Sequence, residues 1–265
     1  MLKQTFGSHK PIIAMVHLPP LPGTALYDRD GGMQKVIDSA ARDIEALQAG
    51  GADALMFGNE GDRPYVTQAT LPTLAAMAVA IGELKRLIKI PMGVNYLWDA
   101  VATVSLAVAA QAKFAREIFT GVYDSDMGLW VPDAASAVKI RGDAGRNDIK
   151  LMYNINAEFA SPVGNRSLAA RAKSAVFASL ADVVLVSGAM TGEAVAFANL
   201  KEAKQAVKDT PVFANTGVNL DNVAEVLKIG DGAIVGTHFK VDGNTWNAVD
   251  RTRVARFMDK VAKLR

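Results

Sequence analysis

Short apolar runs recur along this chain, and a stretch with apolar residues at helical spacing follows each of them. Pro11–Val16 is a continuous apolar run of strand length, which is typical of a strand buried on both faces. In residues 31–49 the apolar positions repeat at helical spacing, and Gly50 and Gly51 end the pattern. These two stretches predict one strand followed by one helix.

The same alternation continues to the end of the chain. The predicted strands are 11–16, 54–57, 92–94, 114–119, 149–153, 182–186, 212–214 and 233–235. The predicted helices are 31–49, 71–88, 99–111, 133–141, 168–180, 200–207, 220–228 and 249–264. Eight strand-then-helix units without a linker predict an α/β fold, a closed (β/α)₈ TIM barrel. A doubly wound open sheet is the main alternative, but it would need fewer units or a second domain.

We expect residues 1–265 to form a single TIM-barrel domain, with 1–10 as an N-terminal arm and 249–265 as a closing helix. A length of 265 residues is normal for one such barrel. Half of the residues are hydrophobic and 21% are charged, which suffices for a large core. The net charge of +2 is too balanced to indicate a nucleic-acid partner.

The chain has no cysteine and three histidines. Disulfides, thiolate metal sites and a cysteine nucleophile are therefore excluded. No cofactor is indicated; a divalent cation stays open and would depend on carboxylates and amides. The N-terminus has no signal-peptide pattern, and the most apolar later stretch, Val101–Ala110, is too short to span a bilayer. We expect a cytoplasmic protein without a transmembrane segment. The Ala-rich helix 99–111 suits either a homo-oligomer interface or close packing on the barrel.

Polar residues stand at the ends of the predicted strands, and in a barrel these ends meet at one mouth. His17 ends the first strand, and the ordinary pKa of histidine suits acid/base catalysis near neutral pH. Glu60 follows the second strand, and alternation turns either Arg116 or Glu117 into the barrel. The candidates for catalysis are His17, Glu60 and Glu117; those for orienting substrate oxygens are Asn59, Asn95, Asn154 and Asn156. Local structural roles compete, such as a Glu60–Arg63 pair.

Small, Gly-containing turns follow the last three strands. Glycines past strand ends let backbone N–H groups approach an anion, and a following helix N-terminus would add its positive dipole end. In TIM barrels the loops after the last two strands commonly hold phosphate. The predicted phosphate-binding residues are Ser187, Gly188, Asn215, Thr216, Gly217, Gly236 and Thr237, with Thr191 and Gly192 in the same loop as Ser187. Ordinary turn glycines are the competing interpretation.

Five stretches together resemble the BtpA/SgcQ family of (β/α)₈-barrel proteins. They are MVHLPPLPG at 15–23, GNEGDRPY at 58–65, YDSDMGL at 123–129, SGAMTG at 187–192 and IVGTHFKVDGNTWNAVD at 234–250. The resemblance implies a barrel similar to the phosphate-binding barrels of tryptophan and histidine biosynthesis. The family takes its name from a protein linked to photosystem I biogenesis, and other members stand among sugar-pathway genes. Asn154 to Glu158 depart from the basic or His-containing pattern that the resemblance implies there.

The first functional hypothesis is an enzyme that binds a small phosphorylated, sugar-like metabolite and performs acid/base lyase, isomerase or hydrolase chemistry. No Lys ends a predicted strand, which argues against a Schiff base. The resemblance adds a second hypothesis, a non-catalytic assembly or stability factor with peripheral association at a membrane surface. A third is a metal-dependent barrel that uses Glu60, Glu117 and Asn95. Fold alone decides none of these.

Overall fold

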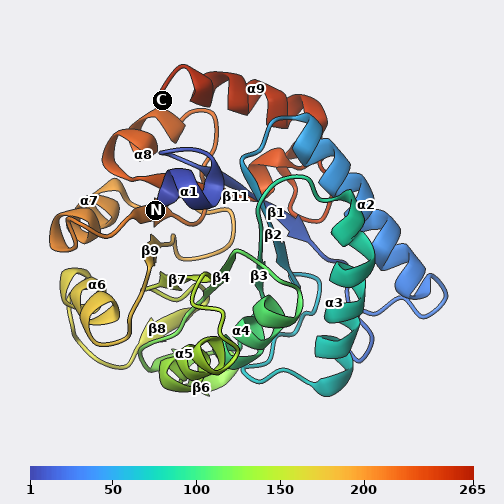
Figure 1. The fold of residues 1–265 in the computed structure, drawn as a ribbon, viewed down its shortest axis with the longest axis horizontal. Helices are drawn as coiled ribbons and strands as arrows, with labels where there is room; N and C mark the ends of the chain where they lie inside the picture. Colours follow the sequence, from blue (N-terminus) through green and yellow to red (C-terminus); the bar gives the residue numbers. More distant parts are fainter.

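The computed structural model describes residues 1–265 and confirms the predicted TIM barrel (Figure 1). Eight parallel strands close in the order β1-β11-β10-β9-β7-β4-β3-β2. The barrel strands are β1 (Ile12–His17), β2 (Ala54–Gly58), β3 (Met92–Asn95), β4 (Phe114–Glu117), β7 (Lys150–Asn154), β9 (Val183–Val186), β10 (Val212–Ala214) and β11 (Gly232–Val235). The fourth strand ends at Glu117, not at residue 119 as predicted.

Helices surround the barrel on its outer face (Figure 1). They are α2 (Gly32–Ala49), α3 (Leu71–Leu84), α4 (Ala100–Ala109), α5 (Ala134–Asp143), α6 (Leu168–Phe177), α7 (Phe197–Ala206), α8 (Val223–Ile229) and α9 (Arg251–Ala262), with 3₁₀ turns at η1 (Lys85–Leu87), η2 (Thr237–Phe239) and η3 (Val241–Gly243). Side-chain caps stabilise several of them; Asp99, for example, accepts the N–H groups of Val101 and Ala102. None of the helices is both long and apolar enough to cross a membrane.

Alternation along the strands sorts the barrel interior into an apolar part and a polar part. The apolar part is filled by Ile13, Met15, Ala54, Met56, Phe114, Met152, Val183, Leu185, Phe213 and Ile234. Two residues beyond these, and so on the same inward face at or just past the strand ends, come polar side chains and two glycines: His17, Gly58, Arg116, Asn154, Ser187, Asn215 and Gly236. The carboxyl end of the barrel is therefore lined by polar groups above an apolar floor.

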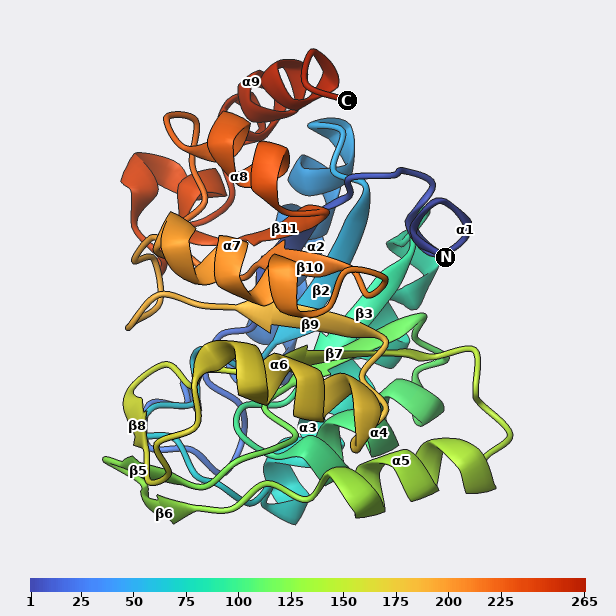
Figure 2. The ribbon, with the colours of Figure 1, turned by 90° about the vertical axis from the view of Figure 1, so that its left-hand side faces the viewer.

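A short helix, α1 (Leu2–Phe6), lies at the amino end of the barrel (Figure 2). The Phe6 ring is 2% exposed and joins the interior cluster, with its centroid 5.1 Å from that of Phe114 and 6.3 Å from that of Phe213. The sequence predicted only an arm here. The packing of three aromatic rings holds the helix in place, and no local pattern in the first residues indicates it.

Gly93 provides the space that the Phe114 ring occupies, because a Cβ on Gly93 would overlap that ring. Gly93→Ala should overpack the interior and lower the free energy of unfolding by about 1–3 kcal/mol. Urea denaturation followed by circular dichroism measures the loss. Gly82→Ala on α3 is the matched control, because a Cβ there meets nothing within 4 Å and alanine favours helix. The prediction is contradicted if Gly93→Ala lowers the free energy of unfolding by no more than Gly82→Ala does.

A second, three-stranded antiparallel sheet stands beside the barrel mouth and was not predicted. It consists of β5 (Tyr123–Ser125), β6 (Gly128–Trp130) and β8 (Ala160–Pro162), which come from the loops after β4 and β7. Figure 2 shows it on the side of the molecule opposite α1. A small apolar cluster that includes Trp98, Tyr123 and Trp130 packs beneath it. The sheet holds the β7–β8 loop, which carries Glu158, against the mouth.

Candidate functional site

A polar pocket opens where the carboxyl ends of the barrel strands meet; we name it the mouth pocket. It is lined by Met15, His17, Glu60, Arg116, Glu158, Thr191, Gly192, Asn215, Thr216, Gly217, Ile234, Gly236 and Thr237. Seven of the residues selected from the sequence are among them: His17, Glu60, Asn215, Thr216, Gly217, Gly236 and Thr237. Active sites of TIM barrels lie at this end. The structure therefore brings together the predicted acid/base pair and most of the predicted phosphate loops.

His17 and Glu60 face each other across the ends of β1 and β2. His17 Nε2 lies 3.4 Å from Glu60 Oε1, and both side chains are less than a tenth exposed. Two glycines make room for the pair. A Cβ on Gly58 would lie 3.0 Å from the Glu60 carboxyl carbon, and one on Gly236 would lie 2.9 Å from His17 Cε1. A larger residue at either glycine would displace the side chain beside it.

Burial favours the neutral form of both groups. It lowers the pKa of His17 to about 3, and the nearby charge of Lys240 adds to the effect. Burial raises the pKa of Glu60 to about 7 against the opposing field of Arg116. Near neutral pH the imidazole is therefore uncharged, and of the two groups Glu60 is the one whose pKa lies close to 7. This differs from the sequence-based expectation, which gave His17 its ordinary pKa.

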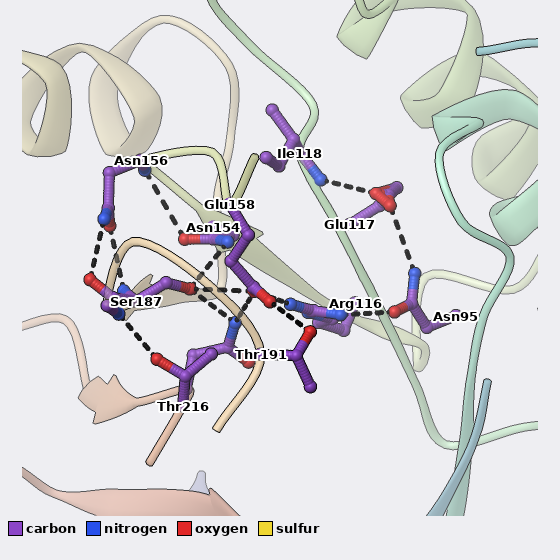
Figure 3. A network of polar contacts seen from close by, with 12 residues as sticks. Asn95, Arg116, Glu117, Ile118, Asn154, Asn156, Glu158, Ser187, Thr191 and Thr216 are labelled. Atoms are coloured by element: carbon purple, nitrogen blue, oxygen red, sulfur yellow. Dashed lines mark hydrogen bonds and ion pairs between the residues drawn. The ribbon is translucent and has the colours of Figure 1, made fainter. Parts of the chain in front are cut away.

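A buried ion pair forms the centre of the polar network at the mouth (Figure 3). Arg116 Nη2 lies 2.8 Å from Glu158 Oε1, and both residues are at most 5% exposed. Glu158 also accepts hydrogen bonds from Ser187 Oγ, Thr191 Oγ1 and Asn215 Nδ2, each at 3.2 Å. One carboxylate, in the loop after β7, thus ties together a side chain of β4 and side chains that follow β9 and β10.

The four asparagines predicted to orient substrate line no part of the mouth pocket. Asn154 Nδ2 donates to Ser187 Oγ at 2.9 Å, and Asn156 exchanges two hydrogen bonds with the Ser187 backbone. Asn59 Nδ2 donates to Asp62 Oδ2 at 2.9 Å, and its Oδ1 accepts the Leu97 N–H. Their hydrogen bonds go to protein partners, and these partners fix the loops around the pocket.

Glu117 also lies outside the mouth pocket. It accepts hydrogen bonds from Asn95 Nδ2 at 3.2 Å and from the Ile118 N–H at 2.9 Å, and Asn95 Oδ1 accepts from Arg116 Nη1. Burial raises the pKa of Glu117 to about 8. Asn95 therefore links Glu117 to Arg116 behind the pocket wall. Catalysis by Glu117 stays a prediction.

The glycine-rich loops after β9, β10 and β11 pack tightly against one another. A Cβ on Gly217, whose φ is +62°, would collide with the backbone of Glu193 and Ala194, and one on Gly188 would meet Glu193. The backbone N–H groups of Gly192, Thr216, Gly217 and Gly236 donate no hydrogen bond within the chain. Residues with unpaired amides from three adjacent loops thus line one pocket.

The helix after β10 does not begin directly at the glycine turn, whereas the short 3₁₀ helix η2 begins directly after Gly236. The helix after Gly217, α8, begins only at Val223, and Asn222 Nδ2 donates to the Gly217 carbonyl at 2.9 Å. A cation is nevertheless close: Arg253 of α9 lines a neighbouring hollow together with Gly192, Gly217, Gly236 and Thr237. Its Nε donates to the His238 carbonyl, and it forms no ion pair.

Several buried polar atoms around the mouth pocket have no hydrogen-bond partner. They are His17 Nδ1, Glu60 Oε2, Arg116 Nε and Asn215 Oδ1, all in residues that line it. Buried polar groups in folded proteins are nearly always paired, because an unpaired one costs about 1–3 kcal/mol. The concentration of such atoms at one place, beside the unpaired amides, is the strongest evidence for a polar ligand.

Sequence reasoning missed Glu158 and Arg253 and left Arg116 undecided. The sequence did give a reason to select Arg116, because a charged side chain inside an apolar strand needs a partner. Glu158 lies four residues past a strand end, where nothing local shows that its side chain turns inward. Arg253 lies on the closing helix, and only the packing of α9 brings it to the glycine loops.

The residues of the metal hypothesis do not form one cluster. Glu60 lines the mouth pocket, whereas Asn95 and Glu117 lie behind its wall. No group of three or more His, Cys, Asp or Glu side chains is arranged to hold a metal ion.

Comparison with known proteins gives a family match over almost the whole chain. A family model described as the BtpA family matches residues 8–263. The sgc region protein SgcQ of Escherichia coli is 47% identical over 264 residues, which cover 100% of this chain and 98% of that protein. The photosystem I biogenesis protein BtpA of Synechocystis sp. is 33% identical over 265 residues, which cover 99% of this chain and 91% of that protein.

Solved structures with this fold include enzymes. Phosphoribosyl anthranilate isomerase from Thermus thermophilus superimposes with a TM-score of 0.59 over 96% of this chain and 100% of that chain. The two sequences are 13% identical. At that identity the likeness concerns the fold, and a shared fold does not carry a shared reaction.

Proposed function

The chain belongs to the BtpA family, and from the geometry of its barrel mouth we propose that it is an enzyme that binds a small phosphorylated, sugar-like metabolite and transfers a proton within it. One observation carries the proposal. Four of the eight unpaired buried side-chain atoms, together with four unpaired backbone amides, belong to residues of one pocket that also holds a His–Glu pair. A ligand rich in oxygen atoms would satisfy both kinds of group.

The phosphate would bind at the loops after β9, β10 and β11. Backbone N–H groups of Gly192, Thr216, Gly217 and Gly236 would donate to its oxygens, and the Thr237 hydroxyl lines the same wall. Arg253 would supply positive charge from the neighbouring hollow. Charge-assisted hydrogen bonds of this kind are about twice as strong as neutral ones.

The proton transfer would use Glu60 with His17 beside it. A carboxyl group with a pKa of about 7 can serve as acid or base near neutral pH. A neutral imidazole can donate a hydrogen bond to a carbonyl or hydroxyl oxygen without releasing its proton. Arg116 and Asn215 would hold further substrate oxygens through the atoms that lack protein partners. This set suits a lyase, an isomerase or a hydrolase.

Gly217→Ala tests the phosphate site. A Cβ there would displace the loop that carries Gly192. In a thermal-shift screen against inorganic phosphate and a panel of sugar phosphates, the unaltered chain should melt at a higher temperature as ligand is added. At 100 times the Kd, binding adds about 2.7 kcal/mol to stability. The variant should show little or no shift.

Gly145→Ala is the matched control for Gly217→Ala. Its φ of +66° gives nearly the same backbone strain, but a Cβ there meets nothing within 4 Å. Both variants should therefore lose about 1–2 kcal/mol of stability from the left-handed backbone. Gly217→Ala should lose more than that because its Cβ also collides with the neighbouring loop, and only the control should keep the ligand shift. A full shift in Gly217→Ala would refute the phosphate site.

Turnover of a compound that binds would establish the enzymatic part of the proposal. Binding without turnover across the panel would overturn it. That result would instead favour a non-catalytic assembly or stability role, and the name of the Synechocystis relative refers to photosystem I biogenesis. Co-sedimentation with lipid vesicles, as expected of a factor acting at a membrane surface, would then be the next measurement.

A further inference from the structure

A second hollow leads away from His17; we name it the basic groove. Its volume is about 400 Å³. It is lined by His17, Leu18, Pro19, Pro20, Ser39, Arg42, Asp43, Gly61, Arg63, Lys240, Thr245, Trp246, Asn247 and Ala248. His17 lines both this groove and the mouth pocket, so the groove and the mouth pocket lie on either side of the imidazole.

The groove carries an excess of positive charge. Arg42, Arg63 and Lys240 line it, and Asp43 is its only carboxylate. Both carboxylate oxygens of Asp43 have partners: Oδ2 lies 2.6 Å from Lys240 Nζ, and Oδ1 accepts a hydrogen bond from the Val249 N–H at 2.8 Å. Neither Arg42 nor Arg63 forms an ion pair. Two guanidinium groups are therefore without a counter-charge.

Lys240 adds a buried cation to the groove wall. The residue is 2% exposed, and Asp43 is the one hydrogen-bond acceptor of its Nζ. An ammonium group has three donors, and only one of them has a partner within the chain. A buried lysine whose donors are not all hydrogen-bonded is held in a fixed position in the groove wall, unlike a lysine that is solvated at the surface.

Trp246 holds Arg63 in position. The guanidinium carbon lies 3.7 Å from the centroid of the indole ring, and Trp246 is 52% exposed. Stacking orders the guanidinium plane at little cost to its hydrogen bonding, because its N–H groups point outward in that plane. Such a plane is suited to two parallel hydrogen bonds to a carboxylate or a phosphate.

We propose that the basic groove binds a second anionic group of the ligand, a carboxylate or a second phosphate, at the end opposite to the phosphate in the mouth pocket. This rests on the proposed function and narrows its substrate class to phosphorylated sugar acids or sugar bisphosphates. The reacting carbon atoms would lie between the two anionic ends, next to His17 and Glu60. Arg63 and Arg42 would decide specificity and take no part in proton transfer.

The test compares ligands that differ only at the second end, using titration calorimetry. The carboxylate pairs are 3-phosphoglycerate with glycerol 3-phosphate, 4-phosphoerythronate with erythritol 4-phosphate, and 6-phosphogluconate with glucitol 6-phosphate. The bisphosphate pair is fructose 1,6-bisphosphate with fructose 6-phosphate. In at least one pair the two-ended compound should bind about 10- to 100-fold more tightly, the size expected for a charge-assisted hydrogen-bonded contact.

Arg63→Gln should abolish that preference and leave the Kd of the one-ended partner unchanged within about twofold. Arg42→Gln should reduce the preference in part. Arg86→Gln removes the same charge from an exposed position on η1, remote from the groove, and should change neither Kd. The melting temperature of each variant verifies that it is folded.

The results of these titrations distinguish a failure of the second anionic site from a failure of the proposed function on which it rests. Equal affinity within every pair for the unaltered chain would overturn the second anionic site and leave the phosphate site standing. Equal weakening of both partners by Arg63→Gln would also overturn it. If no phosphorylated compound binds at all, both proposals fail.

Discussion

Glu158→Ala is expected to lower the free energy of unfolding by about 3–5 kcal/mol, because it leaves the charge of Arg116 buried without a partner. Arg116 and Glu158 are 5% and 3% exposed, so water cannot replace the lost carboxylate easily. The same substitution removes the acceptor of Ser187 Oγ, Thr191 Oγ1 and Asn215 Nδ2. Urea denaturation at neutral pH measures the loss.

Two further variants show whether this loss comes from the ion pair. Glu193→Ala removes a carboxylate from an exposed position in the loop after β9 and should change stability by less than about 0.5 kcal/mol. Arg116→Met combined with Glu158→Ala removes both charges and should recover a substantial part of the loss. A loss of less than about 1 kcal/mol for Glu158→Ala alone would contradict the assignment of a buried ion pair.

Glu60→Gln is expected to change how stability depends on pH. The pKa of Glu60 is raised from 4.5 to about 7 in the folded chain. Between these pH values the unfolded chain binds fewer protons than the folded chain, so Glu60 reduces stability progressively as the pH rises through this window. Glutamine does not titrate, and the variant should therefore gain about 3 kcal/mol relative to the unaltered chain between about pH 4.5 and pH 7.

The free energy of unfolding measured in urea at several pH values tests this. Glu83→Gln, on the exposed side of α3, is the control. Its free energy of unfolding should differ from that of the unaltered chain by the same amount at every pH. Glu117→Gln should show a similar gain that continues to about pH 8, because the pKa of Glu117 is raised to about 8. If the difference between Glu60→Gln and the unaltered chain does not vary with pH, Glu60 is not held in its neutral form by burial.

The same substitution bears on the proposed reaction. Loss of a general acid or base typically lowers a rate by about 10²- to 10⁴-fold. Once a substrate is found, Glu60→Gln should reduce kcat by that amount and remove the pH dependence near 7. An unchanged kcat would remove Glu60 from the reaction.

The barrel could be predicted from the sequence because a local pattern of residues marks each strand. Runs such as Pro11–Val16 are buried on both faces, so every residue in them is apolar, and each is followed by a helical repeat. The residues at the strand ends could be read off for the same reason. Alternation then places His17 and Asn215 on the inward face, two residues beyond Met15 and Phe213.

The second sheet, α1 and Glu158 could not be predicted in this way. Strands of three residues, such as β5 and β6, are too short for a periodic pattern, and α1 depends on Phe6 packing against rings far along the chain. Glu158 turns inward because that sheet holds its loop against Arg116. Each of these features depends on contacts between residues distant in sequence.

The sequence alone determined the family, the eight-fold alternation and the residues that stand at the barrel mouth, because short-range periodicity and strand-end position specify them. Only the tertiary structure decided the surroundings and the hydrogen-bond partners of those residues. Burial sets the pKa values of His17 and Glu60, the asparagines are occupied by neighbouring loops, and α9 brings Arg253 to the glycine loops. Desolvation and hydrogen-bond pairing depend on what surrounds a side chain in space, and that information is not local in the chain.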